Sequence, residues 1–216
     1  QPLRLDDLAW GGGMWLAVGW DKDVAGSRDG EHWEVLEPRP WRLHSVDWAG
    51  GGFVVTAGHR LLTTLDGVDW AVWDDFVAAT FRDVAWNGSV ALAAGTAVVT
   101  STDALRWRLV DRQRGFSRVL WNGNEFVAWE AGFTLSTDGM SWQPLDLPAM
   151  PPGGSLSVRS LAWDGRKIVA KVQYADALLW LVEAGPTVVV PGAAHRVDGE
   201  GRTWRTDLLL TNTGDE

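Results

Sequence analysis

Short segments in which apolar and polar residues alternate recur along the chain, and each ends at a tryptophan. These tryptophans are separated by 38, 38, 35 and 42 residues, and a glycine stands two positions after each of them. The pairs are Trp10 and Gly12, Trp48 and Gly50, Trp86 and Gly88, Trp121 and Gly123, and Trp163 and Gly165. A period of this length is typical of repeat architectures. The pattern predicts five repeats, at about 5–42, 43–80, 81–115, 116–157 and 158–185.

A second segment recurs in the first four repeats with the same period. It reads SRDGEHW (27–33), TLDGVDW (64–70), STDALRW (101–107) and STDGMSW (136–142). The fifth repeat has YADALLWLVEAG (174–185) in its place. Because two separate landmarks keep one spacing, the repeats are not a chance match.

Each repeat contains the material for four short strands. Segments such as FVVTA (53–57) and LLTTL (61–65) are rich in β-branched and aromatic residues, and Asn87-Gly88 and Asn122-Gly123 are tight-turn pairs. No apolar period of 3.6 residues indicates a helix. Four strands in about 37 residues are typical of a propeller blade. The sequence therefore predicts an all-β propeller of four-stranded blades over 1–185. A two-sheet sandwich is the alternative, although it does not require this period.

Composition excludes several classes of function. The formal net charge of -9 argues against a general nucleic-acid surface. The absence of cysteine excludes disulfides and thiolate metal sites, and no apolar run reaches 18 residues. The four histidines are scattered without metal-ligand spacing, and no glycine-rich phosphate loop is present. We expect neither a metal nor a cofactor.

The S/T-x-D-G-x-x-W segments resemble the Asp-box, or BNR repeat, of bacterial propellers. The resemblance implies that each segment forms the turn between the third and fourth strands of a blade, on the face away from the usual binding site. There Asp would hold the turn and Trp would pack between blades. Two departures are a spacing from Asp to Trp that is one residue short and Ala104 in place of glycine. The residues with this implied structural role are Ser27, Asp29, Trp33, Thr64, Asp66, Trp70, Ser101, Asp103, Trp107, Ser136, Asp138 and Trp142.

The last segment, 186–216, lacks the repeat pattern. It resembles the opening of a β-sandwich domain found in bacterial secreted proteins, with Pro191, His195, Trp204, Arg205, Thr206, Asp207 and Asn212 at matching positions. An alternative is that Asp198–Trp204 is a decayed Asp-box. With the start at Gln1 rather than Met, the resemblance implies an exported, extracellular or periplasmic bacterial protein with further domains of the same chain beyond residue 216.

Catalytic chemistry is not well supported by the sequence. Asp-box sialidases carry an R-I-P element and a Tyr–Glu pair, whereas this chain has no R-I-P and its one tyrosine, Tyr174, is near Asp176. Asp-box glucanases need two carboxylates, and Asp74 with Asp75 is the most suggestive pair. That pair falls in a loop between repeats, where a solvated turn is the simpler interpretation.

Propeller topology predicts where a ligand would bind. Loops from the second to the third strand, and from the fourth strand to the next blade, share one face. We expect this face to carry Trp20, Asp21, Asp23, Trp41, Arg42, His59, Arg60, Asp74, Asp75, Arg112, Arg114, Trp129, Glu130 and Tyr174. Exposed Trp and Arg are typical anchors. The arginine-rich stretch 106–118 forms either a solvated edge or a patch for an anionic ligand.

The leading hypothesis is a non-catalytic binding or scaffold module for a glycan or protein ligand. A glycoside hydrolase-like enzyme and a structural spacer without a ligand are the alternatives.

Overall fold

The structure is a computed structural model that describes residues 4–75, 78–145, 157–163, 167–173, 179–183, 189–190, 196–197 and 203–204. The chain divides into two compact units, Gln1–Leu145 and Asp146–Glu216. The division falls within the fourth predicted repeat, 116–157, directly after its last strand. In the described ranges, β-strands are the only regular secondary structure. Within those ranges, no helix has the length and apolar character needed to cross a membrane.

Each of the first four repeats forms one four-stranded antiparallel sheet in which consecutive strands pair. Sheet 1 contains β1 (Asp7–Gly11), β2 (Met14–Val18), β3 (Val24–Ser27) and β4 (Glu34–Val35). Sheet 2 contains β5 (Ser45–Trp48), β6 (Phe53–Ala57), β7 (Arg60–Thr64) and β8 (Trp70–Trp73). Sheet 3 contains β9 (Phe81–Trp86), β10 (Ala91–Gly95), β11 (Val98–Ser101) and β12 (Arg108–Asp111). Sheet 4 contains β13 (Arg118–Trp121), β14 (Phe126–Trp129), β15 (Phe133–Ser136) and β16 (Gln143–Pro144).

The first hairpin has the same register in every sheet of this unit. The tryptophan that ends the first strand pairs with the residue five positions later, as in Trp10 with Trp15 and Trp48 with Phe53. The glycine in the turn takes a positive φ, for example 69° at Gly50, which costs glycine little. A Cβ at Gly50 would also lie 2.8 Å from Cζ2 of Trp86 in the next sheet. The W-x-G pattern therefore forms a hairpin, and the glycine at position 50 also leaves room for the tryptophan of the next sheet.

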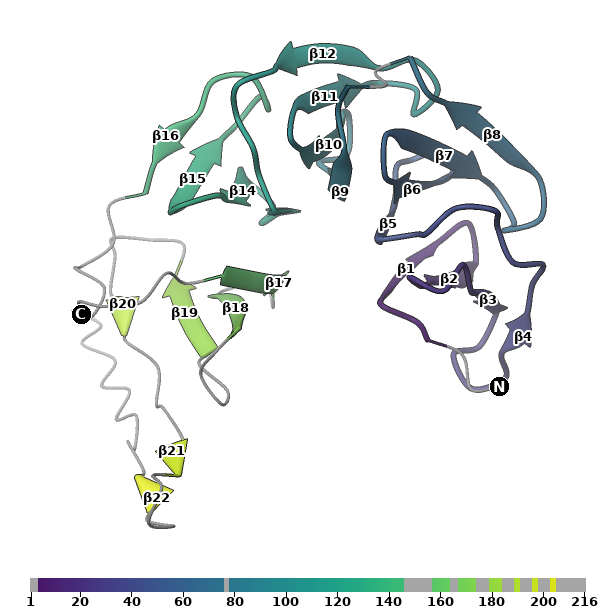
Figure 1. The fold of residues 1–216 in the computed structure, drawn as a ribbon, viewed down its shortest axis with the longest axis horizontal. Helices are drawn as coiled ribbons and strands as arrows, with labels where there is room; N and C mark the ends of the chain where they lie inside the picture. Colours follow the sequence, from purple (N-terminus) through teal and green to yellow (C-terminus); the bar gives the residue numbers. More distant parts are fainter. Residues whose placement is uncertain are drawn as a thin grey trace, which may run out of the picture. The chain divides into compact units, whose positions relative to one another are not determined.

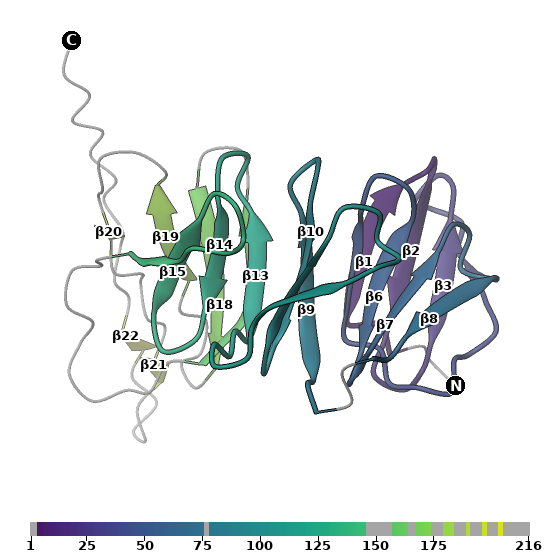
Figure 2. The same cartoon turned by 90° about the horizontal axis from the view of Figure 1, so that it is seen from above.

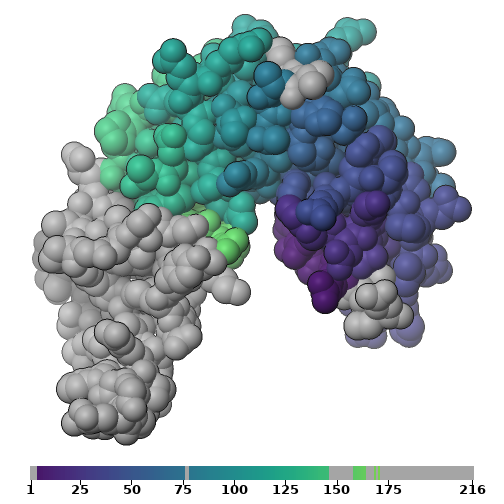
Figure 3. Space-filling view, in the orientation of Figure 1, coloured from purple at the N-terminus to yellow at the C-terminus, as the bar shows by residue number. Residues whose placement is uncertain are grey.

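Sheets 1 to 4 follow one another side by side (Figures 1 and 2), and buried side chains pack between them. Buried side chains of sheets 1 and 2 form one cluster, which includes Leu16 and Phe53. Sheets 2 and 3 form a second, which includes Val54 and Phe81, and sheets 3 and 4 form a third around Phe126. Because β6 is covered on both faces, all of its residues are buried. Apolar runs without alternation, such as FVVTA, follow from this two-sided burial. In the space-filling view, sheets 1 to 4 form a continuous packed body (Figure 3).

In sheets 2, 3 and 4, one face of the sheet packs against the preceding sheet. The corresponding face of sheet 1 is exposed. Leu8 is 54% exposed, whereas its equivalents Val46, Val84 and Val119 are 5%, 5% and 4% exposed. The tryptophan of the S/T-x-D turn shows the same contrast. Trp107 and Trp142 are buried, and Trp33 of sheet 1 is exposed. The tryptophan of this turn is therefore buried in sheets 3 and 4, half-buried in sheet 2 (Trp70) and exposed in sheet 1.

The second unit contains a fifth four-stranded sheet, made of β17 (Ser157–Trp163), β18 (Lys167–Gln173), β19 (Leu179–Glu183) and β20 (Val189–Val190). Trp163 pairs with Ile168, which repeats the register of the first four sheets. Because β20 pairs with β19, the fifth sheet includes residues 189–190.

A separate hairpin joins β21 (Arg196–Val197) to β22 (Thr203–Trp204). Of the tail residues that match the sandwich pattern, only Trp204 falls within the described residues. The others, Pro191, His195, Arg205, Thr206, Asp207 and Asn212, lie outside them.

Candidate functional site

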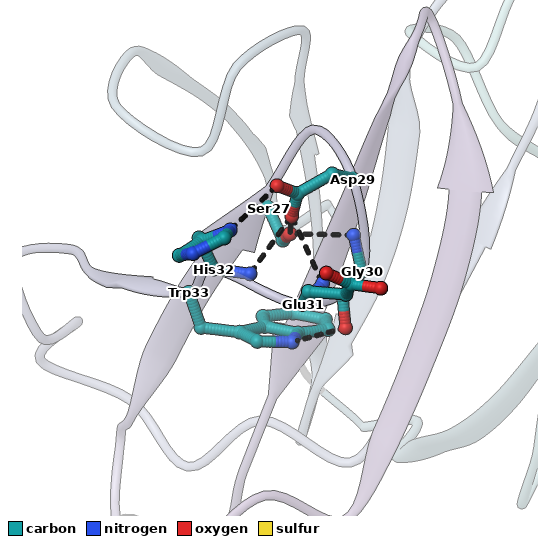
Figure 4. Close-up of polar contacts among 6 residues, drawn as sticks. All are labelled: Ser27, Asp29, Gly30, Glu31, His32 and Trp33. Carbon is teal, nitrogen blue, oxygen red and sulfur yellow. Dashed lines mark hydrogen bonds and ion pairs between the residues drawn. The ribbon is translucent and has the colours of Figure 1, made fainter.

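The four S/T-x-D segments form turns between the third and fourth strands of their sheets. In the first turn, the Asp29 Oδ1 atom accepts hydrogen bonds from the backbone N–H groups of Glu31 and His32 at 2.9 and 2.8 Å (Figure 4). The Ser27 hydroxyl donates to the same oxygen at 3.1 Å and accepts from the Gly30 N–H at 2.8 Å. The hydroxyl and the Asp29 Oδ1 atom are therefore occupied by the turn itself.

The other three turns repeat this arrangement around Asp66, Asp103 and Asp138. We call these three residues and Asp29 the turn aspartates. Backbone N–H donors lower the pKa of all four carboxyls, because they stabilise the charged form. The residue after the turn aspartate takes a positive φ, including the one non-glycine, Ala104, at 59°. The recurring seven-residue segment is a turn, and its hydroxyl and carboxylate do not form a nucleophile–base pair.

The opposite strand ends form a second surface, which we call the loop face. It consists of the turns at 19–23, 58–59, 96–97 and 130–132 and the linkers at 36–44, 74–75, 78–80 and 112–117. Here Trp20, 45% exposed, carries the Arg42 guanidinium 4.6 Å from its ring centroid. The His44 ring stands edge-on to Trp20 at 4.7 Å. Burial lowers the pKa of His44, with Arg82 the next contributor.

A second aromatic–arginine pair lies in sheet 2 and the linker before it. The Arg60 guanidinium lies 5.3 Å from the Trp41 ring centroid, and its Nε atom lies 4.0 Å from Oδ2 of Asp74. The structure therefore brings together Trp41, Arg60 and Asp74, and Arg42 lies beside Trp41 in the chain. Asp74 has a cationic partner, which argues against a free catalytic pair with Asp75.

The remaining predicted residues have more varied surroundings. In sheet 1, Asp21 pairs with Arg4 at 3.4 Å, and Asp23 accepts a bond from the Arg4 N–H at 2.8 Å. His59 is half-buried in the turn between β6 and β7. Asp75 and Arg112 are exposed and line a cavity on sheet 3.

Sheet 4 and the linker before it require one correction. Arg114 pairs with Asp111 at 3.5 Å, and Glu130 accepts a bond from the Gly115 N–H at 3.3 Å. Trp129 ends β14 at the expected edge, but its side chain is 3% exposed and packs on Phe133, so it is not an exposed anchor. Tyr174 lies outside the described residues.

Three carboxylates in the first strands link neighbouring sheets, and sequence reasoning did not identify them. Asp7 accepts from the Val46 N–H at 2.9 Å and Asp47 from the Trp86 N–H at 2.8 Å. Asp83 accepts from the Val119 N–H at 2.8 Å. Each therefore bonds to the first strand of the following sheet. We call Asp7, Asp47 and Asp83 the strand aspartates.

Burial raises the pKa of all three strand aspartates, to about 7 for Asp47 and about 6 for Asp83. A raised carboxyl pKa is a feature of many catalytic acids. Here, however, the second oxygen of each also accepts a backbone N–H bond from the next residue, for example Trp48 to Asp47 at 2.8 Å. The hydrogen bonds of the strand aspartates are therefore those of structural residues and not those of a catalytic acid.

Two signals in the sequence could have revealed these inner residues. Asp7 and Asp83 both stand three positions before the tryptophan that ends the first strand. His44 and Asp6, which the predictions also omitted, both stand next to a first strand. His44 directly precedes β5, and Asp6, directly before β1, accepts the Trp20 N–H at 2.7 Å. A polar residue inside an apolar strand segment, repeated in register, indicates a buried hydrogen-bonding role. Among the residues that the structure describes, no group of three or more His, Cys, Asp or Glu side chains is placed to hold a metal ion.

Comparison with known proteins gives information on the fold. No protein-family model matches the chain, and no curated protein matches it. Solved structures do. An ancestral GH74 enzyme is 16% identical with a TM-score of 0.61, and the match covers 87% of this chain and 31% of that one. The Cps50 (Swd1) β-propeller domain of Myceliophteria thermophila is 12% identical with a TM-score of 0.63, covering 86% and 71%.

A third similar structure contains a bound peptide. YCF48 bound to D1 peptide is 13% identical with a TM-score of 0.60, and the match covers 88% of this chain and 66% of that one. At these identities the likeness concerns the fold and not the activity. The four-stranded antiparallel sheets of this chain are similar to those of the β-propellers that it matches.

Proposed function

We propose that the chain is a non-catalytic binding module, and that its loop face, over sheets 1 and 2, receives a protein or glycan ligand. The observation that carries the proposal is the pair of arginine-on-tryptophan stacks, Arg42 on Trp20 and Arg60 on Trp41. Trp and Arg dominate binding energy at many interfaces. Because the stacks already restrict these side chains, less conformational entropy is lost when a ligand binds.

The carboxylates provide a second argument, against an enzyme. A glycosidase needs two carboxyl groups free to act on substrate, one as acid and one as base or nucleophile. The carboxyls with raised pKa, Asp7, Asp47 and Asp83, accept backbone N–H bonds on both oxygens. Asp74 faces Arg60. These four carboxyls therefore do not supply the pair that the enzyme alternative requires.

The similar structures agree with either class of function. The GH74 protein is an enzyme by its name, and YCF48 is bound to a peptide. The second case supports a protein ligand for the present chain, since propellers present loops on one face of a rigid framework.

Finer features of the fold belong to the same proposal. We propose that the S/T-x-D turns are Asp-boxes and that the five sheets are blades of one propeller. The segment after 186 would then open a β-sandwich domain, in an exported bacterial protein with other domains. The seven-residue motif and the common register of the five sheets support this proposal.

The experiment is a selection for ligands followed by a pair of matched variants. A displayed random-peptide library and a glycan array are screened with the intact chain. The hits are then measured against the combined variant Trp20→Ala, Trp41→Ala and Arg60→Ala. A control variant carries Trp33→Ala, Arg28→Ala and Arg106→Ala, which lie on the turn side. We expect the first variant to weaken binding at least tenfold and the control to leave it unchanged.

Two results would contradict the proposal. The first is binding that survives the loop-face variant unchanged. The second is turnover of a chromogenic glycoside by the intact chain that is lost on Asp74→Ala or Asp75→Ala, which would establish the enzyme alternative.

A further inference from the structure

The tips of the S/T-x-D turns carry exposed apolar side chains. We call the surface formed by these tips the turn face, and each turn takes the number of its sheet, so that turn 2 is 64–70 and turn 3 is 101–107. The residue two positions after the turn aspartate is Val68 in turn 2, Leu105 in turn 3 and Met140 in turn 4, and it is 59%, 55% and 49% exposed. Turn 1 has Glu31 at this position, so the turn itself does not require an apolar residue. Neighbouring exposed apolar side chains mark interaction surfaces in many soluble proteins.

Turns 2 and 3 are held next to each other. The Thr63 hydroxyl, directly before turn 2, donates to the carbonyl oxygen of Ala104 in turn 3 at 2.8 Å. The N–H groups of Val68 and Leu105 donate to the Oδ1 atoms of their turn aspartates, at 2.9 Å in both turns. The two apolar tips therefore have the same local backbone and a fixed spacing. Leu65, which is 66% exposed, adds a third apolar side chain in turn 2.

Opposite charges stand at the next position of these two turns. Asp69 in turn 2 and Arg106 in turn 3 both follow the apolar tip and are exposed, and their N–H groups donate to the turn aspartates at 3.1 and 2.7 Å. Neither side chain forms an ion pair within 4 Å among the residues that the structure describes. Since the positions are equivalent, a two-fold axis between turns 2 and 3 brings Asp69 of each copy opposite Arg106 of the other. An isologous dimer requires this kind of self-complementary surface.

We propose that the turn face is a self-association surface, and that a second copy of this chain docks on it about a two-fold axis between turns 2 and 3. Val68 of one copy packs on Leu105 of the other, and Asp69 pairs with Arg106 of the other copy. The axis repeats each contact, so the interface holds two apolar contacts and two ion pairs. The turn face lies at the strand ends opposite to the loop face, so the proposal does not depend on the ligand proposed there.

The size of the surface sets the expected affinity. Each copy contributes two turns, so the buried area falls in the class of weak interfaces, below about 1,200 Å². We therefore expect a dissociation constant of ~10–100 µM. At ~1 µM protein the chain is then almost entirely monomeric, and stability or loop-face binding measured at that concentration is that of single copies. At an ionic strength of about 0.15 M, the net charge of -9 opposes association only weakly, because charges more than about 8 Å apart are screened.

The test is sedimentation equilibrium of the intact chain between ~1 and ~500 µM, a range that brackets the expected dissociation constant. We expect the mean mass to rise from that of one chain to that of two, and not beyond. A mass of one chain over the whole range would overturn the proposal. So would a mass that passes two chains, because an isologous interface closes at a dimer.

Charge reversal then locates the axis. Asp69→Arg and Arg106→Asp each place like charges opposite each other, and each should weaken dimerisation at least about tenfold. The double variant restores opposite charges and should return the dissociation constant to within about threefold of the original. Glu31→Arg and Arg28→Asp make the same charge changes in turn 1 and are the controls, with no change in association. The unfolding midpoint of each variant shows that it is folded. A double variant that dimerises no better than the single ones, or controls that lose as much affinity, would overturn the proposal.

Discussion

Two sets of aspartates recur with the repeat, and their surroundings are opposite. The turn aspartates lie on the exposed turns, and N–H groups of their own turn lower their pKa. The strand aspartates lie in the first strands, where burial raises the pKa although N–H groups from two sheets bind each carboxyl. A carboxylate that accepts hydrogen bonds near water is stabilised in its charged form, and one that is withdrawn from water is not.

The comparison separates two structural tasks of one residue type. A turn aspartate closes a loop of four residues within one sheet, so its loss affects local geometry. A strand aspartate joins residues of consecutive sheets, about one repeat apart in sequence, as Asp47 joins Trp86. We therefore expect the strand set to contribute more to the cohesion of the unit Gln1–Leu145.

The largest expected effect follows from removing one strand aspartate. Asp83 accepts bonds from the Ser45 hydroxyl and from the Val84 and Val119 N–H groups. Asp83→Ala leaves these donors without the carboxylate, which we expect to lower the free energy of unfolding by about 3 kcal/mol. Urea unfolding followed by tryptophan fluorescence measures the loss. The exposed Asp69→Ala is the control, with a change within about 0.5 kcal/mol. A loss at Asp83 no larger than this control would remove the distinction between the two sets.

The pH dependence of stability is expected to differ in sign between the sets. The folded-state pKa values of Asp47 and Asp83 lie above the unfolded value of about 3.9. The part of their contribution that depends on protonation is therefore complete below pH ~4 and is lost as the pH rises through about 6 for Asp83 and about 7 for Asp47. For the turn aspartates, with lowered pKa, the contribution is present above pH ~4 and is lost on further acidification.

His44, whose pKa is lowered, opposes the strand aspartates on acidification below pH ~6.5. The strand contribution is therefore isolated by subtracting the pH profile of an Asp47→Ala variant from that of the unchanged chain. The difference in unfolding free energy should decrease between pH 4 and 7. A difference that increases over this interval would contradict the assignment of Asp47.

A smaller effect is expected from the backbone of the turns. Ala104 holds a φ of 59° where the other turns have glycine. Ala104→Gly relieves about 1 kcal/mol of left-handed strain but loses the contacts of a buried Cβ worth about 0.8 kcal/mol, so stability should change little. The reverse change, Gly139→Ala, adds the strain and places a Cβ 2.7 Å from Cδ1 of Leu92, and should cost about 1–2 kcal/mol. If the two variants changed the free energy of unfolding by equal amounts of opposite sign, the packing of the Cβ at this position would contribute nothing.

The repeated features of the fold could be predicted from the sequence because the same packing contacts and hydrogen bonds recur in each repeat. Gly50 must accommodate Trp86, and Asp138 must accept the N–H groups of its turn. Such constraints leave the same residue at the same position in successive repeats. The hairpins, the four strands per repeat and the placement of the S/T-x-D turns followed from them.

Features that belong to one repeat could not be predicted in this way. Trp129 ends a strand at the loop-face edge, and only the three-dimensional packing against Phe133 shows that it is buried. The cavity on sheet 3 is lined by residues of three separate segments, among them Asp75, Thr96 and Arg112, which a sequence pattern does not bring together. The position of His44 beside Trp20 depends on the path of the linker before β5.

We propose that the turns maintain the fold and that the loop face binds the ligand, so affinity and stability measured on the same variants separate the two roles. Using a ligand from the peptide or glycan selection, affinity and unfolding free energy are measured for Asp138→Ala and for the combined Trp20, Trp41 and Arg60 variant. We expect Asp138→Ala to lose about 1–2 kcal/mol of stability and to bind normally once folded. The combined variant should lose at least tenfold in affinity. Binding lost in folded Asp138→Ala, and retained in the combined variant, would show that the turns and not the loop face carry the binding site.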